Sequence, residues 1–444
     1  MKLSLFFYVY QEHLLKYFYP VNYISITMEN KKVIIVGGGF GGLLAAKEFK
    51  DTDFDATIID KTNHHLFQPL LYQVAAAALS PADIAIPIRS VFRNQKNIKV
   101  LLDEVISVDK ENNTIKLSNS ELKFDHLILS PGARHSYFGN DTWEKYAPGL
   151  KTLSDALKIR ELILNSLEAA EKELDLNQRK KYLTFVVIGG GPTGVELAGA
   201  IAEIAKKTMI RDYKNFCADD TIIVLVEALP RILTSYSPDL SDKAKEDLVK
   251  MGVDIQLNKK VTDVNENGVQ LGDVFIESKN VIWAAGNVAS PLLKTLNIDL
   301  DKAGRAIVES DCSVPGYSNI FVVGDAAIMK DDKGEVLPGV APVAMQQGRF
   351  VGKLIKSGLD KSNRKKFTYV DKGSMATIGK AKAVAMISGL KLSGLIAWLA
   401  WSFVHIFFLI GFRNRFRVFA EWIWYYITNR QGTRLITNAL KERK

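Results

Sequence analysis

The sequence predicts an α/β protein built from two Rossmann-type units, in which parallel strands alternate with helices, followed by a helical C-terminal tail. Two similar glycine-rich turns, about 150 residues apart, predict the units: VIIVGGGFGG at 33–42 and FVVIGGGPTGVE at 185–196. Each turn follows β-branched residues and precedes an Ala/Leu-rich stretch, which is the strand–turn–helix context of a pyrophosphate-binding loop. The tail is predicted by an aromatic- and arginine-rich stretch that begins near residue 391.

The glycines of each turn have separate roles. The first permits a tight turn, the second lets the backbone approach a pyrophosphate, and the third lets the helix pack closely on the strand. In the first copy these are Gly37, Gly39 and Gly42, with Gly38, Phe40 and Gly41 between them; in the second they are Gly189, Gly191 and Gly194. Two such turns predict two dinucleotides in one chain, and hence electron transfer between them.

The first unit is expected to contain a strand at 33–36, a helix at 43–49 and a strand at 56–59. Asp60 ends this second strand, where a carboxylate would accept hydrogen bonds from ribose hydroxyls; the alternative is a solvated carboxylate at a strand end. Further strands are predicted at 99–108, 114–117 and 126–129, and the last runs into the small-residue turn 130–133.

The second unit is expected to begin after a helix at about 154–174 and to contain a helix at 195–207 and a strand at 221–226. Glu227 ends this strand at the ribose position, where a carboxylate repels a 2′-phosphate and favours NAD over NADP. Arg231 nearby weakens that preference. A strand at 280–283 leads into Gly286, a further candidate for the nucleotide. A strand at 319–323 ends in Gly324 and Asp325, where the aspartate can bind a polyol hydroxyl.

Composition limits the alternatives. The chain has 444 residues, enough for two or three domains, and only two cysteines, Cys217 and Cys312. Their separation predicts no disulfide framework and no metal site, and it argues against flavoenzymes that use a redox-active cysteine pair. The net charge of +9 is compatible with nucleic acid or an anionic membrane. No folded basic face for nucleic acid is recognisable, so we expect none to bind.

The tail explains part of this charge. The stretch 392–412 carries no formal charge and is long enough to span a membrane, but arginines follow at once, interleaved with aromatic residues. Aromatic–arginine helices of this kind lie in the headgroup plane and favour anionic lipid. We therefore expect in-plane amphipathic helices at 391–444, with a true span as the alternative. We also expect residues 1–27 to be disordered or to arise from an upstream start codon, because Met28 directly precedes the first strand.

Four further stretches are more specific than the glycine turns: HHLFQPLLYQVA at 64–75, LPGVAPVAMQQG at 337–348, GSMATIGK at 373–380 and VHIFFLIGFRNR at 404–415. With them the chain, from about residue 32 to 436, resembles the type II NADH:quinone oxidoreductases. These are single-subunit, non-pumping flavoenzymes with a glutathione-reductase-like pair of dinucleotide-binding domains.

The resemblance implies that the first turn binds FAD and the second binds NADH. It implies that Asp60 and Lys61 hold the adenosine ribose end, that Val105 meets adenine through its backbone, and that Asp325 holds the ribitol. The Ala344 backbone and Lys380 would lie beside the isoalloxazine; alternatively, Lys380 is simply an exposed lysine. The implied domains are residues 28–152 and 291–390 for FAD and residues 153–290 for NADH.

The resemblance also implies a quinone site. The family motif Ala-Gln-x-Ala-x-Gln reads APVAMQ at 341–346, so Pro342 replaces its first glutamine. Gln346 and Gln347 remain as candidates to donate to a quinone carbonyl, or they only cap local backbone. Glu196, on the first turn of the second unit's helix, is implied to couple proton movement to quinone reduction. Its alternative role is to cap the helix and orient NADH.

The sequence therefore predicts an FAD-dependent, membrane-associated respiratory enzyme that passes electrons from NADH to a membrane quinone. The family precedent places it on the cytoplasmic face of the membrane, bound peripherally and with a possible homodimer. Two alternatives remain. A soluble ferredoxin-type reductase shares both glycine turns but would need a polar C-terminal domain, and a non-enzymatic flavoprotein sensor would lack an acceptor site.

Overall fold

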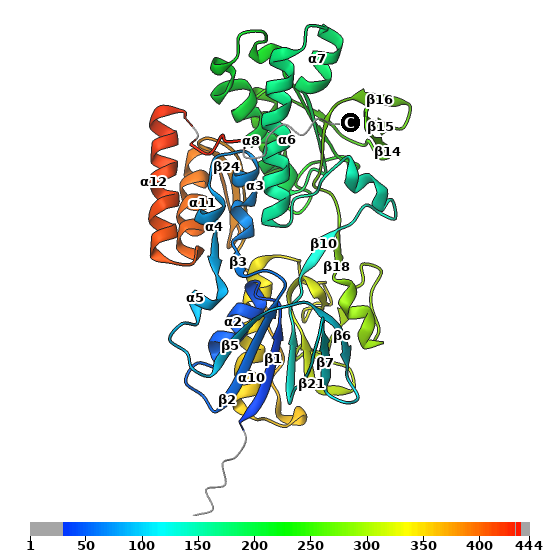
Figure 1. Ribbon diagram of the computed structural model, residues 1–444, viewed down its shortest axis with the longest axis vertical. Coiled ribbons are helices and arrows are strands. Elements are labelled where there is room, and N and C mark those ends of the chain that lie inside the picture. The colour runs from blue at the N-terminus through cyan, green and yellow to red at the C-terminus, as the bar shows by residue number, and fades with distance from the viewer. Residues whose placement is uncertain (1–29, 431, 437–444) are drawn as a thin grey trace, which may run out of the picture.

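The computed structural model describes residues 30–430 and 432–436, and the expectation for residues 1–27 lies outside this part of the chain. Two α/β bodies follow one another along the long axis of the molecule, and the last two helices lie against the side of the upper body (Figure 1). The chain starts in the lower body, crosses into the upper one, returns, and ends beside the upper one.

The lower body is built on a six-stranded sheet with the order β20-β21-β9-β1-β2-β5. Strand β1 is central and parallel to both β2 and β9, and β21 is parallel to β9. Its apolar residues are almost all buried, as expected for a parallel strand covered on both faces. The strands are β1 (Lys31–Val36), β2 (Phe54–Asp60), β5 (Ile98–Leu102), β9 (His126–Leu129), β20 (Ser313–Val314) and β21 (Tyr317–Val322).

Two helices of the lower body pack against each other closely. They are α2 (Phe40–Glu48), which follows the first glycine turn, and α10 (Ala341–Ser357). A methyl group on Gly348 would lie 2.1 Å from the Gly41 carbonyl oxygen, so only glycine permits this contact. The remaining strands of this body are β6 (Val105–Asp109), β7 (Thr114–Leu117), β8 (Glu121–Lys123), β19 (Ala306–Ile307) and β22 (Ala327–Ile328).

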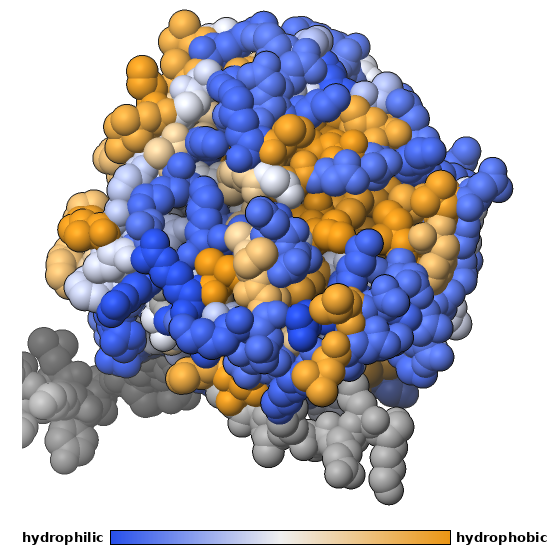
Figure 2. All heavy atoms as spheres, turned by 90° about the horizontal axis from the view of Figure 1, so that it is seen from above, coloured by the Kyte–Doolittle hydropathy of each residue, from blue (hydrophilic) through white to orange (hydrophobic). Residues whose placement is uncertain are grey.

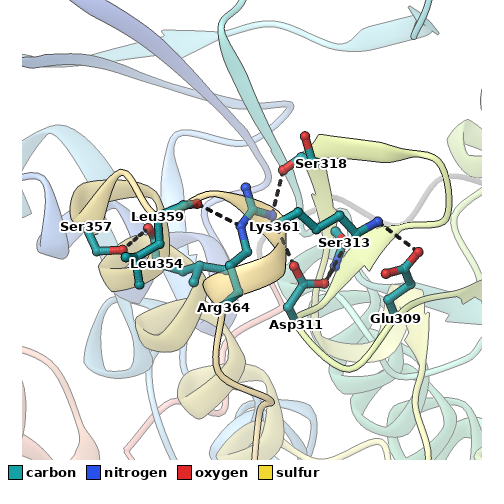
Figure 3. A network of polar contacts seen from close by, with 9 residues as sticks. All are labelled: Glu309, Asp311, Ser313, Ser318, Leu354, Ser357, Leu359, Lys361 and Arg364. Atoms are coloured by element: carbon teal, nitrogen blue, oxygen red, sulfur yellow. Dashed lines mark hydrogen bonds and ion pairs between the residues drawn. The ribbon is translucent and has the colours of Figure 1, made fainter.

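A polar network fixes the chain after α10 to the edge of this sheet (Figure 3). The Arg364 guanidinium donates to Asp311 Oδ2 at 3.0 Å and to the Ser318 carbonyl at 2.8 Å. Asp311 also accepts from Ser313, and its ion pair with Arg364 is buried. These bonds lower the pKa of Asp311 against the opposing effect of burial. The network thus holds the start of the segment that leads to the upper body.

The upper body contains a parallel sheet with the order β13-β12-β11-β17 and an antiparallel sheet β14-β15-β16. Helices cover the parallel sheet, and the second glycine turn connects β11 to α8 (Figure 1). The strands are β11 (Thr184–Ile188), β12 (Ile222–Val226), β13 (Val253–Gln256), β14 (Val261–Asn265), β15 (Gly268–Leu271), β16 (Val274–Glu277) and β17 (Asn280–Trp283). The helices are α6 (Leu153–Lys172), α7 (Leu176–Leu183), α8 (Pro192–Glu203) and α9 (Pro238–Lys250), and a π-helical turn, Ile204–Thr208, continues α8.

Short elements connect the two bodies. Strands β10 (Ala133–His135) and β18 (Asn287–Ala289) pair antiparallel where the chain leaves and re-enters the lower body. The segment after β2 forms β3 (His64–Leu66), α3 (Leu71–Ala75), α4 (Pro81–Ile84), β4 (Ala85–Pro87) and α5 (Ile88–Val91). Within it, α3 packs on α6 and α8, so the first unit supplies part of the wall of the upper body.

The C-terminal region begins with an antiparallel sheet, β23 (Ser374–Gly379), β24 (Lys382–Ile387) and β25 (Leu390–Ser393). Helices α11 (Gly394–Phe408) and α12 (Phe412–Thr428) follow and lie side by side in Figure 1. The apolar stretch 392–412 is therefore not one element, since Gly411, at φ +90°, separates the two helices. Within the described residues, no helix combines the length and apolar character required to cross a membrane.

Most predicted elements lie where the sequence indicated, within a few residues at their ends. The exception is the single strand expected at 99–108, which the structure divides into β5 and β6. The two strands belong to different sheets. Asp103 and Glu104 between them are polar, and the Glu104 backbone N–H donates to the Asp103 side chain, which makes the turn.

Candidate functional site

The first glycine turn has the geometry of an anion-binding loop. Gly37 has φ +97°, and a methyl group there would lie 2.2 Å from the Ser130 carbonyl oxygen. Gly42 packs so closely that its added methyl would lie 1.9 Å from the Gly37 carbonyl oxygen. Gly39 caps α2 and faces open space, with nothing within 4 Å of an added methyl. A pyrophosphate can therefore approach the backbone at the N-terminus of α2.

Asp60 braces this turn from the end of β2. Its Oδ2 accepts the Gly38 N–H at 2.6 Å, and its Oδ1 accepts the Thr62 N–H at 2.7 Å. The carboxylate is therefore not a free, solvated strand end. Oδ1 also accepts the Thr62 hydroxyl at 2.8 Å, so Oδ2 is the oxygen that keeps a further lone pair for a ribose hydroxyl.

The second turn repeats this arrangement. Gly189 has φ +111°, an added methyl on Gly194 would lie 1.8 Å from the Gly189 carbonyl oxygen, and Gly191 faces open space. Glu227 Oε2 accepts the Gly190 N–H at 2.6 Å, and Glu227 Oε1 accepts the Leu229 N–H at 2.8 Å. The two units thus hold equivalent loops with equivalent carboxylate braces.

Several predicted flavin residues converge on the first turn. A methyl on Gly41 would lie 3.3 Å from the Ala344 carbonyl oxygen, and one on Gly324 would lie 3.0 Å from Ala344 Cβ. Ser130 Oγ accepts the Gly42 N–H at 3.2 Å. The open face at Gly39, the helix N-terminus behind it and the convergence of three chain segments fit the pyrophosphate and ribitol of FAD.

The other predicted flavin residues are arranged around this loop. Phe40 begins α2 and packs edge-on against His65, with ring centroids 5.1 Å apart. Asp325 is half-buried in the turn after β21, Val105 is buried at the start of β6, and Lys61 is exposed beyond Asp60. In the upper body Gly286 adopts φ +71° beside Phe138. Their contacts with nucleotide remain predictions.

Gln347 is buried, and its Oε1 accepts the Gly324 N–H at 2.7 Å. Gln346 bonds the Val370 backbone through both of its polar atoms, at 2.9 and 3.0 Å. Both glutamine side chains therefore bind backbone that is distant in the sequence, and not the local backbone at the start of their own helix. Donation to a quinone remains a prediction, and it would require Gln346 to share or exchange these bonds.

A cavity of about 70 Å³ lies between α8, the β23–β24 turn and the C-terminal helices. Its lining combines six aromatic side chains with four acidic or basic ones that can carry protons or charge. Its lining includes Tyr72, Gln73, Ala78, Glu196, Ala200, Glu203, Thr377, Gly379, Lys380, Trp398, Trp401, Glu421, Trp422, Tyr425 and Tyr426. The side chains come from both dinucleotide-binding units and from the tail.

Glu196 lines this cavity from the first half of α8. Burial raises the pKa of its carboxyl to about 8, and the Thr377 N–H, 3.4 Å from Glu196 Oε1, lowers it slightly. The group is therefore largely protonated at neutral pH and can release or take up a proton near that pH. Lys380 lies across the cavity, where its ammonium donates to the Tyr426 carbonyl at 2.8 Å and to Asn429 Oδ1 at 2.7 Å. Those bonds cap the end of α12.

Sequence reasoning missed several residues of this cavity. Tyr72 OH accepts from Gln73 Nε2 at 2.7 Å, and Gln73 Oε1 accepts from Trp422 Nε1 at 2.8 Å, which ties α3 to α12. Trp401 is 1% exposed. Two buried donor atoms, Trp401 Nε1 and Tyr426 OH, have no hydrogen-bond partner among the described residues. The stretch 64–75 was recognised as characteristic, but only the packing of α3 on α8 shows why.

Sequence reasoning also missed Lys151, which is not among the residues that line this cavity. It is partly buried, and burial lowers the pKa of its ammonium while the Asp325 carboxylate raises it. The pair places a cation beside the predicted ribitol ligand. Within the described ranges, no group of three His, Cys, Asp or Glu side chains is arranged so that it could hold a metal ion.

Comparisons with known proteins cover nearly the whole chain. Residues 31–348 match the family model of pyridine nucleotide-disulphide oxidoreductases, and residues 372–431 match that of the NDH2 C-terminal domain. A type II NADH:quinone oxidoreductase (NdhA) of Mycobacterium tuberculosis is 42% identical over 92% of this chain and 90% of its own length. One of Staphylococcus haemolyticus is 29% identical over 83% and 92%.

Two solved structures show the same fold. NDH2 of Plasmodium falciparum in complex with NADH has a TM-score of 0.83 at 23% identity, covering 90% of this chain and 99% of that one. The sulfide:quinone oxidoreductase of Aquifex aeolicus has a TM-score of 0.71 at 17% identity, covering 87% and 92%. With the two nucleotide loops and the matched C-terminal domain, these relationships establish that the chain belongs to the type II NADH:quinone oxidoreductases, a family of FAD-dependent flavoenzymes.

Proposed function

We propose that the chain binds FAD at the first glycine turn and NADH at the second, and that it reduces a membrane quinone in the cavity lined by Glu196. The observation that carries the quinone assignment is a pair of buried donors without partners. Trp401 Nε1 and Tyr426 OH line the cavity and lack acceptors among the described residues. A quinone offers two carbonyl oxygens and an apolar ring, which suits these donors and the aromatic walls.

Different residues of the chain would bind each nucleotide and hold the proton for the reaction. FAD, when bound, accepts two electrons from nicotinamide and gives them to the quinone. Gly37–Gly42 and Asp60 would hold its adenosine diphosphate part, and Gly324 and Asp325 would hold its ribitol part. Gly189–Gly194 and Glu227 would position NADH. Glu196 would hold a proton at its carboxyl, ready for the quinone oxygen that becomes a hydroxyl.

We also propose that α11 and α12 bind the membrane in its surface plane. On α12, exposed apolar residues recur at helical spacing, and on α11 they continue the same kind of stripe. They are Leu395, Ile396, Leu399, Phe403 and Phe407 on α11, and Phe412, Phe416, Phe419, Ile423 and Ile427 on α12. In the view from above, small groups of hydrophobic residues lie at the left, the side on which both helices lie in Figure 1, and a larger hydrophobic area lies right of centre (Figure 2). Exposed arginines beside them would meet anionic headgroups.

The finer assignments follow from this orientation and are part of the proposal. Attachment would be at the cytoplasmic face, where NADH is available, and the partners would be membrane lipid and quinone. A homodimer through the C-terminal region is compatible with exposed apolar surface that lipid does not cover. Sedimentation in detergent, at several protein concentrations, tests the dimer, since a single monomeric species would reject it.

The test of the function is NADH oxidation by purified protein with a soluble quinone analogue. We expect quinone-dependent loss of NADH absorbance, with one quinol formed for each NADH consumed. NADPH should be a poorer donor, because the Glu227 carboxylate repels a 2′-phosphate. If added quinone does not increase NADH oxidation above the slow reaction with oxygen, the quinone assignment is wrong.

A further inference from the structure

A second buried carboxylate, Glu203, lines the same cavity. It lies at the end of α8 and is 8% exposed. Its Oε1 accepts the Lys380 backbone N–H at 2.5 Å, and its Oε2 accepts the Tyr425 hydroxyl at 3.2 Å. Burial raises the pKa of the Glu203 carboxyl, and these hydrogen bonds partly offset the effect. A buried carboxylic acid of this kind is costly to keep for stability alone.

Glu196 and Glu203 lie seven residues apart on α8, which places them on the same face of the helix. The rise of an α-helix separates them by about 10 Å along the axis, too far for direct proton transfer. Both carboxyl groups line the cavity of about 70 Å³, which is large enough for water. Water in this cavity would connect the two carboxylic acids into a chain along which a proton can move.

The turn that follows Glu203 contains one exposed residue, Lys207. Directly after Glu203 the helix widens into the π-helical turn Ile204–Thr208, in which the Met209 N–H donates to the Ile204 carbonyl. Such turns are common at functional sites. Lys207, exposed on this turn, lies one turn beyond Glu203. The titratable groups that face Glu203 or share its cavity, from its own and neighbouring elements, are Glu196, Lys207, Tyr72, Lys380, Glu421, Tyr425 and Tyr426.

We propose that Glu203 is the proton entry residue of the quinone cavity: it takes a proton from solvent at the π-helical end of α8 and passes it through cavity water toward Glu196. The proposal rests on the proposed function. Its balance is NADH + H⁺ + quinone → NAD⁺ + quinol, in which the hydride supplies both electrons and one proton. The solvent supplies the second proton, and the Glu203 carboxyl is re-protonated after each turnover.

Glu203→Gln is the central test. The amide keeps the volume and the acceptor oxygen for the Lys380 N–H but cannot carry a proton. We expect quinone-dependent turnover to fall about 10-fold or more, within the range of general acid–base effects. Ferricyanide takes electrons without protons, so NADH:ferricyanide activity should be unchanged. Glu203→Asp, which retains a carboxyl, should recover part of the quinone activity.

The matched control is Glu168→Gln. Glu168 also accepts a tyrosine hydroxyl, that of Tyr213 at 3.1 Å, but it does not line the cavity. Its variant should keep full quinone activity. A structural role for Glu203 alone would lower the quinone and ferricyanide activities together, with loss of bound flavin, and would overturn the proposal. So would a Glu203→Gln variant with wild-type quinone turnover.

An independent readout is the infrared carboxylic acid band. Difference spectra between acid and alkaline pH should contain a carbonyl band that is absent from Glu203→Gln and present in Glu168→Gln. If the wild-type protein reduces ferricyanide but no quinone, the proposed function fails whatever Glu203 does. If it reduces quinone and Glu203→Gln does so equally, only the proton entry role fails.

Discussion

In each nucleotide loop, a single carboxylate side chain accepts hydrogen bonds from two backbone N–H groups. Asp60 and Glu227 differ by one methylene group, yet each accepts a glycine N–H of its turn at 2.6 Å and a second backbone N–H two residues later in the chain. The carboxylates were assigned to ribose recognition from sequence, and the structure adds a bracing role. Each loop is therefore held in shape by the same side chain that would select the ribose.

A side chain added at the open glycine of each loop should impair the binding of one nucleotide and not of the other. Gly39→Val would place a branched side chain where the pyrophosphate approaches, so we expect the purified protein to lose FAD, as measured by its absorbance in the visible region. Gly191→Val should keep FAD but raise the KM for NADH about 10-fold or more, since a lost anion contact costs at least ~1.4 kcal/mol. Loss of FAD from Gly191→Val would contradict the assignment of the two turns.

Glu196 makes the stability of the fold depend on pH. Its carboxyl pKa is about 8 in the fold and near the usual 4.5 in the unfolded chain, so between these values the folded state holds the extra proton. The free energy of unfolding should therefore fall as pH rises from about 4.5 to about 8. In this range the Glu196 carboxyl of the unfolded chain releases its proton, whereas the folded protein keeps it, so rising pH favours the unfolded state. In Glu196→Gln this part of the pH dependence should vanish from denaturant melts, and quinone turnover should drop while NADH:ferricyanide activity remains. An unaltered melting profile would place the titration elsewhere.

At the scale of elements, the contact between α8 and β23 positions the cavity. A methyl group on Gly199 would lie 1.8 Å from the Ile378 carbonyl oxygen, so α8 reaches the β23 backbone only through glycine. This contact brings Glu196 to Thr377 and Glu203 to Lys380. The sequence does not reveal it, because a glycine inside a helix has no signature of its partner strand.

Gly199→Ala should therefore disturb the cavity before it disturbs the nucleotide loops. Pushing α8 off β23 would cost about 1–3 kcal/mol of stability, as overpacking usually does. We expect a lower midpoint in urea, quinone turnover reduced more than ferricyanide turnover, and retained FAD. Ala200→Gly, at the neighbouring cavity position, is the control for helix propensity and should cost about 1 kcal/mol without a selective loss of quinone activity.

Much of the element pattern was predictable, and the reasons differ by region. The parallel strands and the glycine turns have local signatures, so 33–36, 126–129 and 280–283 were located closely. The cavity was not, because α3, α8, β23 and α12 come together from distant parts of the sequence. The bonds of Gln346 and Gln347 to Val370 and Gly324 likewise depend on tertiary packing that no motif encodes.

At the scale of the whole molecule, the apolar stripe on α11 and α12 defines the face that would meet lipid. Phe403, Phe407 and Phe416 are 71%, 60% and 64% exposed, so replacing them with serine should leave the fold intact. A buried phenylalanine contributes about 1.5–3 kcal/mol, and the triple variant should bind anionic vesicles at least about 10-fold more weakly. Flotation of the protein with vesicles measures this.

The control for that experiment uses two exposed leucines that lie outside the stripe. Leu174 precedes α7 and Leu176 is its first residue, and they are 86% and 71% exposed. Replacing both with serine should not change flotation. Equal losses in the two variants would mean that exposed apolar surface of any kind drives binding, and the proposed orientation on the membrane would be wrong.

Helix α12 supplies part of the cavity wall, and this has a consequence for the order in which the protein folds during synthesis. Trp422, Tyr425 and the carbonyl of Tyr426 contact Gln73, Glu203 and Lys380, so one wall of the cavity belongs to a helix that follows both nucleotide-binding units in the chain. Both glycine turns emerge well before it. A nascent chain can thus form both nucleotide loops before the cavity for the electron acceptor is complete, and the cavity closes only after α12 has been synthesised.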